Sequence, residues 1–325
     1  MTNRVWFDAR SLSRGYTSGW ERYVRELAKY LPNLIDITFW TPKTKNRLNL
    51  LLSDFQNQQS QKGHKLAHYP TYPPVRIEKN LKKIITVHDL TWWKYPETSS
   101  FLGKNYYRKN MEEAIKTSDL IICPSKSIKN ELNEMFSISL ERIEAIPHGN
   151  SLPIGKISNQ SKPYFLSIGT IEPRKNLIFY SKAIENSGLK SNFDFLHVGR
   201  FGWDKLPPNL KHISAKNDQE LSDLIINSIA VVVPSKYEGF GLPVLESHVQ
   251  GVPVIMSDVN SLIELSSESD KIFKLSDLNS LIGALIYFSK NKTTLNSQEL
   301  EIAKSYTWKN SAQHHIKTYL RLLDE

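Results

Sequence analysis

Two glutamates frame a glycine-containing turn within VVVPSKYEGFGLPVLESHVQGVPVI, residues 231–255. Glu238 precedes the turn and Glu246 follows it. The turn between them consists of Gly239, Phe240, Gly241, Leu242 and Pro243. Glycine lets the backbone approach a ligand closely, and proline suits the first turn of a helix because its missing N–H would be unpaired there. The pattern predicts a strand over 230–235, a ligand-binding turn and a helix over 243–250.

The helix over 243–250 would begin at the carboxyl edge of a sheet, where doubly wound folds bind ligands. Free amides such as those of Leu242 and Val244 would then point at an anion, as in a phosphate site. Carboxylates beside an anion site are useful when they bond to hydroxyl groups, as on a ribose or a hexose. An isolated pair of glutamates is more often a surface residue and a helix cap, but the glycines, the proline and the strand that follows favour the ligand site.

A basic pair occurs in the loop EPRKN, residues 172–176, which follows an expected strand over 164–170. Arg174 and Lys175 would lie at the carboxyl edge of the second sheet, opposite the helix that carries Glu246. Two cations with helix amides can hold a diphosphate. Such a pair on a loop is otherwise usually only solvated, and the sequence leaves open which of the two reaches the phosphates.

Other candidate residues follow expected strands. His88 and Asp89 end the strand over 83–89. A histidine at this position is either a structural residue or a residue that contacts a bound substrate. Gly199, Arg200 and Gly202 follow the strand over 193–199 and form either a plain turn or a ligand loop.

Two further patterns argue against other kinds of site. The loop RGYTSGWERY at 14–23 includes Gly19 but lacks the G-x-G-x-x-G spacing of a dinucleotide fingerprint. His314 and His315 have no partner at metal-ligand spacing, so we interpret them as helix surface.

Short apolar runs alternate with amphipathic helical patterns, which predicts parallel strands joined by crossover helices. Strands are expected in the first half over 4–9, 36–41, 65–69, 83–89, 120–125 and 143–149. In the second half they are expected over 164–170, 193–199, 211–215, 230–235 and 252–258. The segment 149–163 has the composition of a linker. Thr307 is the expected N-cap of a last helix.

Composition and charge narrow the function classes. The 325 residues favour two domains, and no apolar run reaches the ~20 residues of a spanning helix. The N-terminus lacks the pattern of a secretory signal, so we expect a cytoplasmic protein. Cys123 is the only cysteine and reads as a buried strand residue. Of the net charge of +9, residues 1–155 contribute +8 and residues 156–325 contribute +1.

Several motifs together resemble those of the family 4 retaining glycosyltransferases. PSKYEGFGLPVLE followed by GVPVIMSD resembles their E-x7-E signature, and FLSIGTIEPRKNL at 165–177 resembles their donor-phosphate loop. VHDLTWWKYPE at 87–97, SDLIICPS at 118–125 and RIEAIPHGN at 142–150 resemble their N-domain and junction landmarks. The similarity covers nearly the whole chain and is specific for the class, not for the sugar.

The resemblance implies the α/β GT-B fold, with two Rossmann-like doubly wound domains facing a cleft and a C-terminal helix that returns toward the N-domain. The expected domains are an acceptor-binding domain over 1–155, a nucleotide-sugar-binding domain over 156–305 and a returning helix over 306–325. It implies transfer of a hexose from a nucleotide-diphosphate sugar, with retention and without a metal or other cofactor. GTIEPRKN resembles the corresponding segment of mannosyl and rhamnosyl transferases of surface polysaccharide assembly. GDP-mannose is therefore the first candidate for the donor.

The resemblance also assigns roles to residues. His88, Glu238, Arg174 and Lys175 are the expected catalytic residues, with His88 facing the transferred sugar and Glu238 positioning its hydroxyls. The expected donor-binding residues are Gly19, Thr170, Gly199, Arg200, Gly239, Phe240, Gly241, Leu242, Val244 and Glu246. The sequence departs from the family at one point: the family often has arginine directly after the strand's glycine, whereas here Gly169 is followed by Thr170.

Two other functions stay open at this point. A GT-B sugar phosphorylase or epimerase would also bind sugar and phosphate, and a nucleic-acid-binding protein would suit a pI near 9.3. The scattered charge and the lack of a helix-turn-helix or an aromatic RNA platform disfavour nucleic acid. The expected acceptor is a glycan or lipid-linked saccharide, and the basic first half favours one at an anionic inner membrane face. Its expected contact points are Lys43, Lys45, Arg47, the apolar run LNLLL at 48–52, Lys62, Lys65, Lys79, Lys82 and Lys83.

Overall fold

The computed structural model describes residues 5–14, 19–42, 57–71, 78, 80–96, 101–158 and 162–324. The chain divides into two compact units. Unit 1 combines Met1–Gly149 with Thr307–Glu325, and unit 2 is Asn150–Tyr306. The chain therefore crosses between the units twice, once at 149–150 and once at 306–307.

Unit 1 contains a six-stranded parallel sheet in the order β2-β1-β3-β4-β5-β6. Its strands are β1 (Val5–Asp8), β2 (Ile37–Trp40), β3 (Leu66–Tyr69), β4 (Lys82–Thr86), β5 (Leu120–Cys123) and β6 (Ile143–Ala145). Its helices are α1 (Gly19–Tyr30), α3 (Thr91–Lys94), α4 (Phe101–Thr117), α5 (Lys126–Phe136) and α12 (Trp308–Asp324), with short 3-10 turns at Arg10–Arg14, Leu31–Asn33 and Leu140–Arg142. Cys123 is fully buried in β5, as expected.

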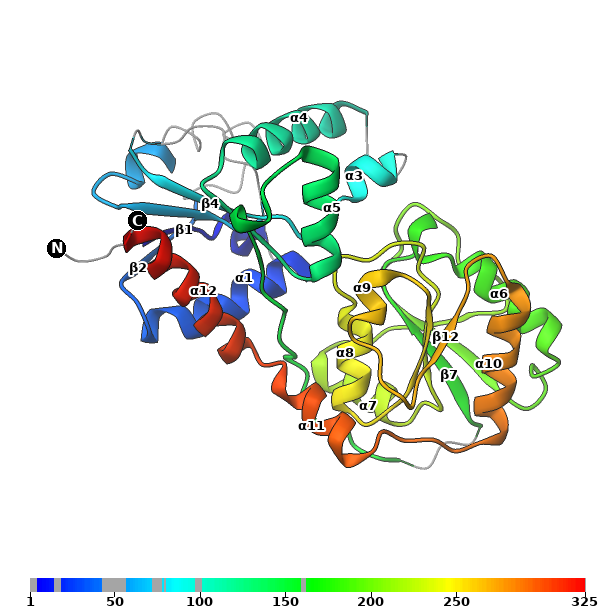
Figure 1. Ribbon diagram of the computed structural model, residues 1–325. Helices are drawn as coiled ribbons and strands as arrows, with labels where there is room; N and C mark the ends of the chain where they lie inside the picture. The colour runs from blue at the N-terminus through cyan, green and yellow to red at the C-terminus, as the bar shows by residue number, and fades with distance from the viewer. Residues whose placement is uncertain are drawn as a thin grey trace. The chain divides into compact units, whose positions relative to one another are not determined.

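The core of unit 1 joins one face of this sheet to α1 and α12. Phe7 and Ile84 of the sheet pack in one cluster with Leu27 of α1 and with Trp308 and Tyr319 of α12. Figure 1 shows α12, at the red end of the chain, beside α1. The last helix therefore packs into the core of unit 1, together with the first strand and the first helix of the chain.

Unit 2 contains a second six-stranded parallel sheet, in the order β12-β11-β10-β7-β8-β9. Its strands are β7 (Tyr164–Ile168), β8 (Asp194–Val198), β9 (Lys211–Ile213), β10 (Val231–Val233), β11 (Val254–Ser257) and β12 (Lys271–Phe273). Its helices are α6 (Leu177–Ser187), α7 (Asp218–Ile226), α8 (Leu242–Val249), α9 (Asn260–Ile263), α10 (Leu278–Lys290) and α11 (Ser297–Ser305), with a 3-10 turn at Pro173–Lys175.

Alternate residues of the buried strands point to opposite faces of this sheet. Phe165 and Ile255 join one core with α6 and α10, while Leu166 and Val254 join the other core with α7, α8 and α9. Both faces are therefore covered, as in other parallel sheets, and the carboxyl ends of β7, β8 and β10 meet at one edge.

Of the strands that the structure describes, the sequence predicted all except β12, and it placed the helix now seen as α8 within one residue. Thr307 caps α12 as predicted, because its Oγ1 accepts the amide of Asn310 at 3.1 Å. No helix in the described part of the chain has the length and apolar character of a membrane-spanning segment.

Candidate active site

The turn after β10 has the backbone that its glycines predict. Gly241 has φ +105°, a conformation that favours glycine, and a Cβ there would lie 2.7 Å from Leu262. Its carbonyl accepts the amide of Val244 at 2.9 Å. The expectation of a free Val244 amide is therefore wrong, because the left-handed Gly241 closes the first turn of α8 on itself. Leu242 remains the candidate amide at this helix start.

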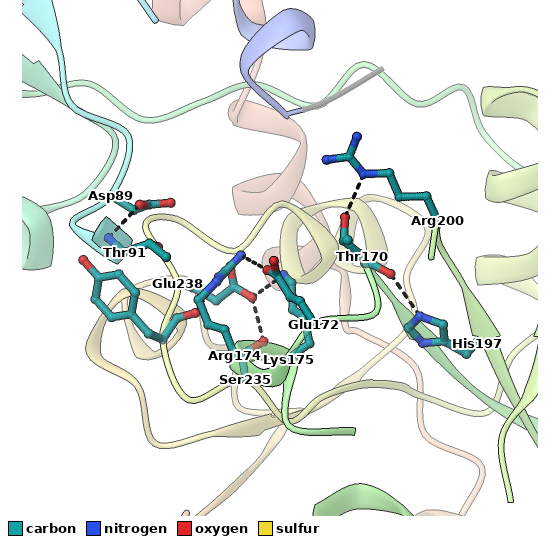
Figure 2. A network of polar contacts seen from close by, with 12 residues as sticks. Asp89, Thr91, Thr170, Glu172, Arg174, Lys175, His197, Arg200, Ser235 and Glu238 are labelled. Carbon is teal, nitrogen blue, oxygen red and sulfur yellow. Dashed lines mark hydrogen bonds and ion pairs between the residues drawn. The ribbon is translucent and has the colours of Figure 1, made fainter. Parts of the chain in front are cut away.

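Glu238 is the centre of an ion-pair network in unit 2 (Figure 2). Its Oε1 accepts from Lys175 Nζ at 2.6 Å and from Ser235 Oγ at 2.6 Å. Its Oε2 accepts from Arg174 Nη1 at 3.0 Å, and Arg174 Nη2 reaches Glu172 Oε1 at 2.6 Å. Glu238 as a whole is 7% exposed, so these are contacts of a largely dehydrated side chain.

The backbone also holds these residues in place. Arg174 Nη1 donates to the carbonyl of Tyr237 at 2.7 Å, and the Lys236 amide donates to the carbonyl of Arg174 at 2.8 Å. Ser261 Oγ donates to the carbonyl of Glu238 at 2.6 Å. The loop after β7 and the loop after β10 are thereby tied to each other.

The electrostatics of Glu238 fix its protonation state. Burial by itself raises the pKa of this carboxyl, but the charges of Lys175 and Arg174 and the hydrogen bonds from Lys175 and Ser235 bring it down to about 2. Glu238 is therefore anionic at neutral pH and cannot act as a general acid there. It can hold cations and accept hydrogen bonds from hydroxyl groups.

Arg174 and Lys175 do meet at the carboxyl edge of the sheet, as predicted, but both are bound to Glu238. The sequence had assigned the cations to phosphate and Glu238 to hydroxyls, and it did not predict that the three side chains pair with one another. Among the described residues, Lys175 Nζ donates one hydrogen bond, to Glu238. An ammonium has three donors, so Lys175 retains donors for a ligand.

The loops after β7 and β8 pack back to back. The Gly169 amide donates to the Val198 carbonyl at 2.9 Å, and a Cβ on Gly199 would lie 1.7 Å from the Gly169 oxygen. A Cβ on Gly202 would lie 2.6 Å from the Ile171 oxygen. Gly199 and Gly202 are therefore required for close backbone approach between loops, whatever else they contact.

Thr170 and Arg200 face each other across these loops. Arg200 is exposed, and its Nε donates to Thr170 Oγ1 at 3.2 Å. His197 supports the same loops: its Nε2 lies 3.0 Å from the Gly169 carbonyl, and its Nδ1 lies 2.8 Å from Ser167 Oγ. Burial lowers the pKa of His197 to about 4, so this histidine is a neutral support for the loop.

The remaining donor-site candidates of unit 2 lie on or next to α8. Glu246 is on the helix and only 4% exposed, and Phe240 is 6% exposed with its ring 6.4 Å from that of Tyr306. Gly239 precedes Phe240 in the turn. Glu246 is therefore buried and not a surface glutamate.

In unit 1, His88 lies two residues beyond the end of β4 and is half-buried. Its Nε2 lies 2.8 Å from the carbonyl of Pro70, an acceptor, so Nε2 carries the proton and Nδ1 is the acceptor nitrogen. Burial lowers the pKa of His88 to about 4, against the opposing effects of the Pro70 carbonyl and Asp89. The neutral imidazole offers a lone pair at neutral pH. Gly19 begins α1, and residues 15–18 of its loop lie outside the described residues.

One histidine assignment was wrong. His314 is exposed as expected, but His315 is fully buried against the core. Its Nδ1 lies 2.7 Å from the Ser311 carbonyl and its Nε2 lies 2.6 Å from Tyr23 Oη of α1. The carbonyl fixes the proton on Nδ1, so Tyr23 donates to Nε2.

The same network continues into the sheet. Tyr23 Oη lies 3.1 Å from Thr86 Oγ1, and Thr86 Oγ1 lies 2.8 Å from His68 Nε2. His68 Nδ1 lies 2.6 Å from Tyr319 Oη on α12. Each of these buried polar groups is thus satisfied. Helix α12 is hydrogen-bonded to α1 and β3, and Thr86 of β4 is bonded in turn to both of those partners.

Sequence reasoning missed several residues of the site. Glu172 and Ser235 are close in the sequence to Arg174 and Glu238, and their spacing could have suggested local contacts. Trp20 stacks on His88 with ring centroids 5.9 Å apart. Nothing in the sequence pattern around Trp20 indicated this contact.

Comparisons with known proteins agree with this architecture. Residues 154–304 match the family Glycosyl transferases group 1, and residues 61–152 match Glycosyltransferase Family 4. The chain is 26% identical over 276 residues to O-antigen chain mannosyltransferase B of Escherichia coli, covering 76% of this chain and 72% of that protein. It is 26% identical over 209 residues to O-antigen chain mannosyltransferase RfbU of Salmonella typhimurium, covering 61% of this chain and 57% of that protein.

Solved structures confirm the fold. Sucrose-phosphate synthase from Thermosynechococcus elongatus superposes with a TM-score of 0.80 at 18% identity, covering 99% of both chains. Anabaena HepE in complex with UDP-glucose superposes with a TM-score of 0.71 at 14% identity, covering 97% of this chain and 98% of that one. Two six-stranded parallel sheets of the GT-B type are therefore confirmed.

Proposed function

The chain belongs to the glycosyltransferases with group 1 and family 4 domains, and from this premise we propose that it moves mannose from GDP-mannose to a saccharide acceptor with retention of configuration. The proposed acceptor is a glycan or a lipid-linked saccharide of surface polysaccharide assembly. The donor sugar is suggested by the similarity to O-antigen chain mannosyltransferases over 76% and 61% of this chain. The observation that carries the proposed chemistry is the Glu238 network at the carboxyl edge of the second sheet.

In the proposed reaction, the leaving group is a nucleoside diphosphate whose negative charge grows as the glycosidic bond breaks. Stabilising such charge is usually the largest catalytic effect of a site. Lys175 is the better candidate for the phosphates, because it uses one donor on Glu238. Arg174 uses its two Nη1 donors on Tyr237 and Glu238 and has an Nη2 contact to Glu172. Arg174 therefore holds Glu238 and the loop in position.

Glu238 would keep Lys175 in place before the donor arrives. As a carboxylate with further lone pairs, it would also accept hydrogen bonds from sugar hydroxyls. Glu246 is proposed to bind the ribose, and His88 is proposed to face the transferred sugar through its unprotonated Nδ1. We expect transfer to persist in EDTA, because Lys175 and the start of α8 supply positive potential without a metal.

Nucleotide preference and product configuration test this proposal. Thermal unfolding is measured with GDP, UDP, dTDP and ADP, where a ligand at 100 times its Kd adds ~2.7 kcal/mol. Transfer from GDP-mannose is followed with a mannoside acceptor, and the anomeric configuration of the product is read by NMR. Stabilisation by GDP alone and an α-linked product support the proposal. Stabilisation by UDP alone, or an inverted product, would contradict the donor or the stereochemistry.

A further inference from the structure

The imidazole of His88 is held by one hydrogen bond and by the rings packed around it. Its Nε2 donates to the Pro70 carbonyl at 2.8 Å. The ring of Tyr23 stands at 87° to it with centroids 4.8 Å apart, and the ring of Trp20 stacks on it at 18° with centroids 5.9 Å apart. The ring of His148 lies 5.6 Å away. The torsion about Cβ–Cγ of a histidine has broad preferences, so the direction of Nδ1 depends on these packed rings.

Tyr23 is itself fixed by hydrogen bonds at the far end of its ring. The residue is fully buried. Its Oη lies 2.6 Å from His315 Nε2 on α12 and 3.1 Å from Thr86 Oγ1 on β4. A ring on α1 that packs against His88 is therefore anchored to the last helix of the chain and to the strand that precedes His88.

The carbonyl of Ser311 sets the direction of the hydrogen bonds at Tyr23. A carbonyl only accepts, so His315 donates to it from Nδ1 at 2.7 Å and accepts the Tyr23 hydroxyl at Nε2. A tyrosine hydroxyl has one proton, so Thr86 donates to Tyr23 Oη. Tyr23 thus donates to one neighbour and accepts from the other.

The remaining bonds of the chain follow from the same count of protons. His68 must donate from Nε2 to Thr86 Oγ1 at 2.8 Å, and it then accepts from Tyr319 Oη at Nδ1, at 2.6 Å. Burial lowers the pKa of His68 and His315, so both rings are neutral, as this arrangement requires. Hydrogen bonds that run in one direction polarise and strengthen one another, and Tyr23 lies within such a chain.

We propose that the C-terminal helix α12 positions the imidazole of His88 for sugar transfer, and that Tyr23 is the positioning residue through which it acts. His315 holds the Tyr23 hydroxyl, and the Tyr23 ring keeps His88 in the orientation that bonds to Pro70. All these residues belong to unit 1. The inference rests on the proposed function, because it takes His88 as the residue that faces the transferred sugar. It gives α12 a part in the reaction as well as in the core.

Tyr23→Phe tests the positioning role, because it keeps the ring and removes the hydroxyl. We expect kcat to fall about tenfold, the factor equivalent to one buried hydrogen bond, and both KM values to stay within about twofold. Tyr319→Phe is the matched comparison, since it removes a buried hydroxyl from the far end of the same chain and leaves both bonds of Tyr23 in place. It lowers the thermal unfolding midpoint as well but leaves kcat unchanged. An equal loss of kcat in the two variants would overturn the proposal, because it would reflect destabilisation alone.

Two substitutions of His315 test the same hydrogen bond from the side of α12. Glutamine can accept the Tyr23 hydroxyl through its amide oxygen, whereas phenylalanine has no acceptor. We expect His315→Phe to lower kcat as much as Tyr23→Phe, without further loss in the double variant, because both remove one bond. His315→Gln keeps most of the wild-type kcat. Additive losses in the double variant, or equal kcat in the glutamine and phenylalanine variants, would show that this bond does not act on His88.

The state of His88 is read without any sugar or nucleotide. Long-range proton–nitrogen NMR spectra of the full chain, labelled in histidine, show the tautomer of each ring, and His88→Asn identifies the His88 signals. We expect the Nε2–H tautomer in the wild type and in Tyr319→Phe, and a mixture of the two tautomers in Tyr23→Phe. A pure Nε2–H tautomer in Tyr23→Phe contradicts the positioning role. If Tyr23→Phe alters the tautomer but the wild type transfers no sugar, the transferase proposal fails and the positioning of His88 stands.

Discussion

At the scale of single residues, Glu238 combines structural and chemical roles. Its two carboxylate oxygens bind Lys175, Ser235 and Arg174 while the side chain is buried. Replacing a carboxylate by an amide keeps the shape but removes the charge that these cations balance. The residue therefore influences both the stability of the loops and the placement of any group that reaches Lys175.

We predict that Glu238→Gln lowers both the free energy of unfolding and kcat. Breaking a buried ion pair by removing one partner costs about 3–5 kcal/mol, with the smaller value expected because the amide can still bond. Chemical denaturation and steady-state kinetics measure the two effects. Glu268→Gln, an exposed glutamate of the same unit, is the control and leaves both unchanged. Wild-type turnover in Glu238→Gln would remove this residue from the site.

The two neighbouring cations are predicted to differ. Lys175→Ala reduces kcat about 10²-fold or more, by analogy with the loss of one oxyanion donor, and weakens nucleotide binding. Arg174→Ala chiefly lowers the free energy of unfolding, because it releases Glu172, Glu238 and the Tyr237 carbonyl. Nucleotide titration calorimetry and denaturation of each variant test this division, with exposed Lys182→Ala as control. A larger loss of nucleotide affinity in Arg174→Ala would reverse the assignment.

At the scale of elements, Gly199 shows how one loop sets the place of another. We predict that Gly199→Ala lowers the thermal unfolding midpoint and nucleotide affinity together, because its Cβ would lie 1.7 Å from the Gly169 oxygen. Gly283→Ala is the matched control in α10, where a Cβ meets nothing within 4 Å. That change should raise stability by up to ~1 kcal/mol, since alanine favours helix. Equal tolerance of the two substitutions would mean that the loop relaxes freely.

The attachment of α12 to unit 1 predicts acid sensitivity. Burial lowers the pKa of His315 to about 4 and lowers the pKa of His68 and His148 well below the usual value. Unfolded histidines titrate near ~6.5, so the unfolded state binds more protons below that pH. Their stabilisation is complete above about pH 6.5 and is lost as the pH falls toward 4, with a slope of up to ~1.4 kcal/mol per pH unit for each histidine.

Urea denaturation between pH 8 and 4 measures this slope. His315→Phe should lower stability at pH 8, because Tyr23 loses its acceptor, and should flatten the dependence between pH 6.5 and 4. His314→Gln changes an exposed neighbour on the same helix and should leave the slope as it is. A slope in His315→Phe as steep as in the wild type would exclude His315 from the acid response.

At the scale of the whole molecule, the sequence predicted the sheets well because their central strands, such as β1, β5 and β10, are apolar runs that are buried throughout. It missed β12, whose residues Lys271–Phe273 contain one buried side chain at the sheet edge. It placed Glu238, Arg174 and Lys175 at one sheet edge because the parallel strands β10 and β7, which precede them, both end there. It could not predict their mutual pairing, which depends on side-chain distances. The burial of His315 depends on Tyr23, 292 residues away in the chain.

The uneven charge gives a prediction for the entire enzyme. Lys62 and Lys65 are exposed in unit 1, while Lys43, Lys45, Arg47, Lys79 and the run at 48–52 lie outside the described residues. We expect sedimentation with anionic liposomes at low salt and release at high salt, since each basic residue near such a surface adds ~1 kcal/mol. Lys62→Glu with Lys65→Glu should weaken binding, whereas Lys182→Glu with Lys274→Glu in unit 2 should not. Binding that ignores lipid charge would favour a soluble acceptor.

The chain passes between the two units twice, and this has a consequence for how the protein folds during its synthesis. Unit 1 needs α12 to close its core around Tyr23 and Trp308, yet α12 is translated about 160 residues after β6. Translation adds about 5–20 residues per second. The core of unit 1 therefore stays incomplete for roughly 10 to 30 s while the whole of unit 2 is synthesised. Unit 2 is contiguous and can fold during that interval. Of the two units, the one whose synthesis begins first therefore matures last, and we expect its exposed apolar face to bind chaperones during that interval.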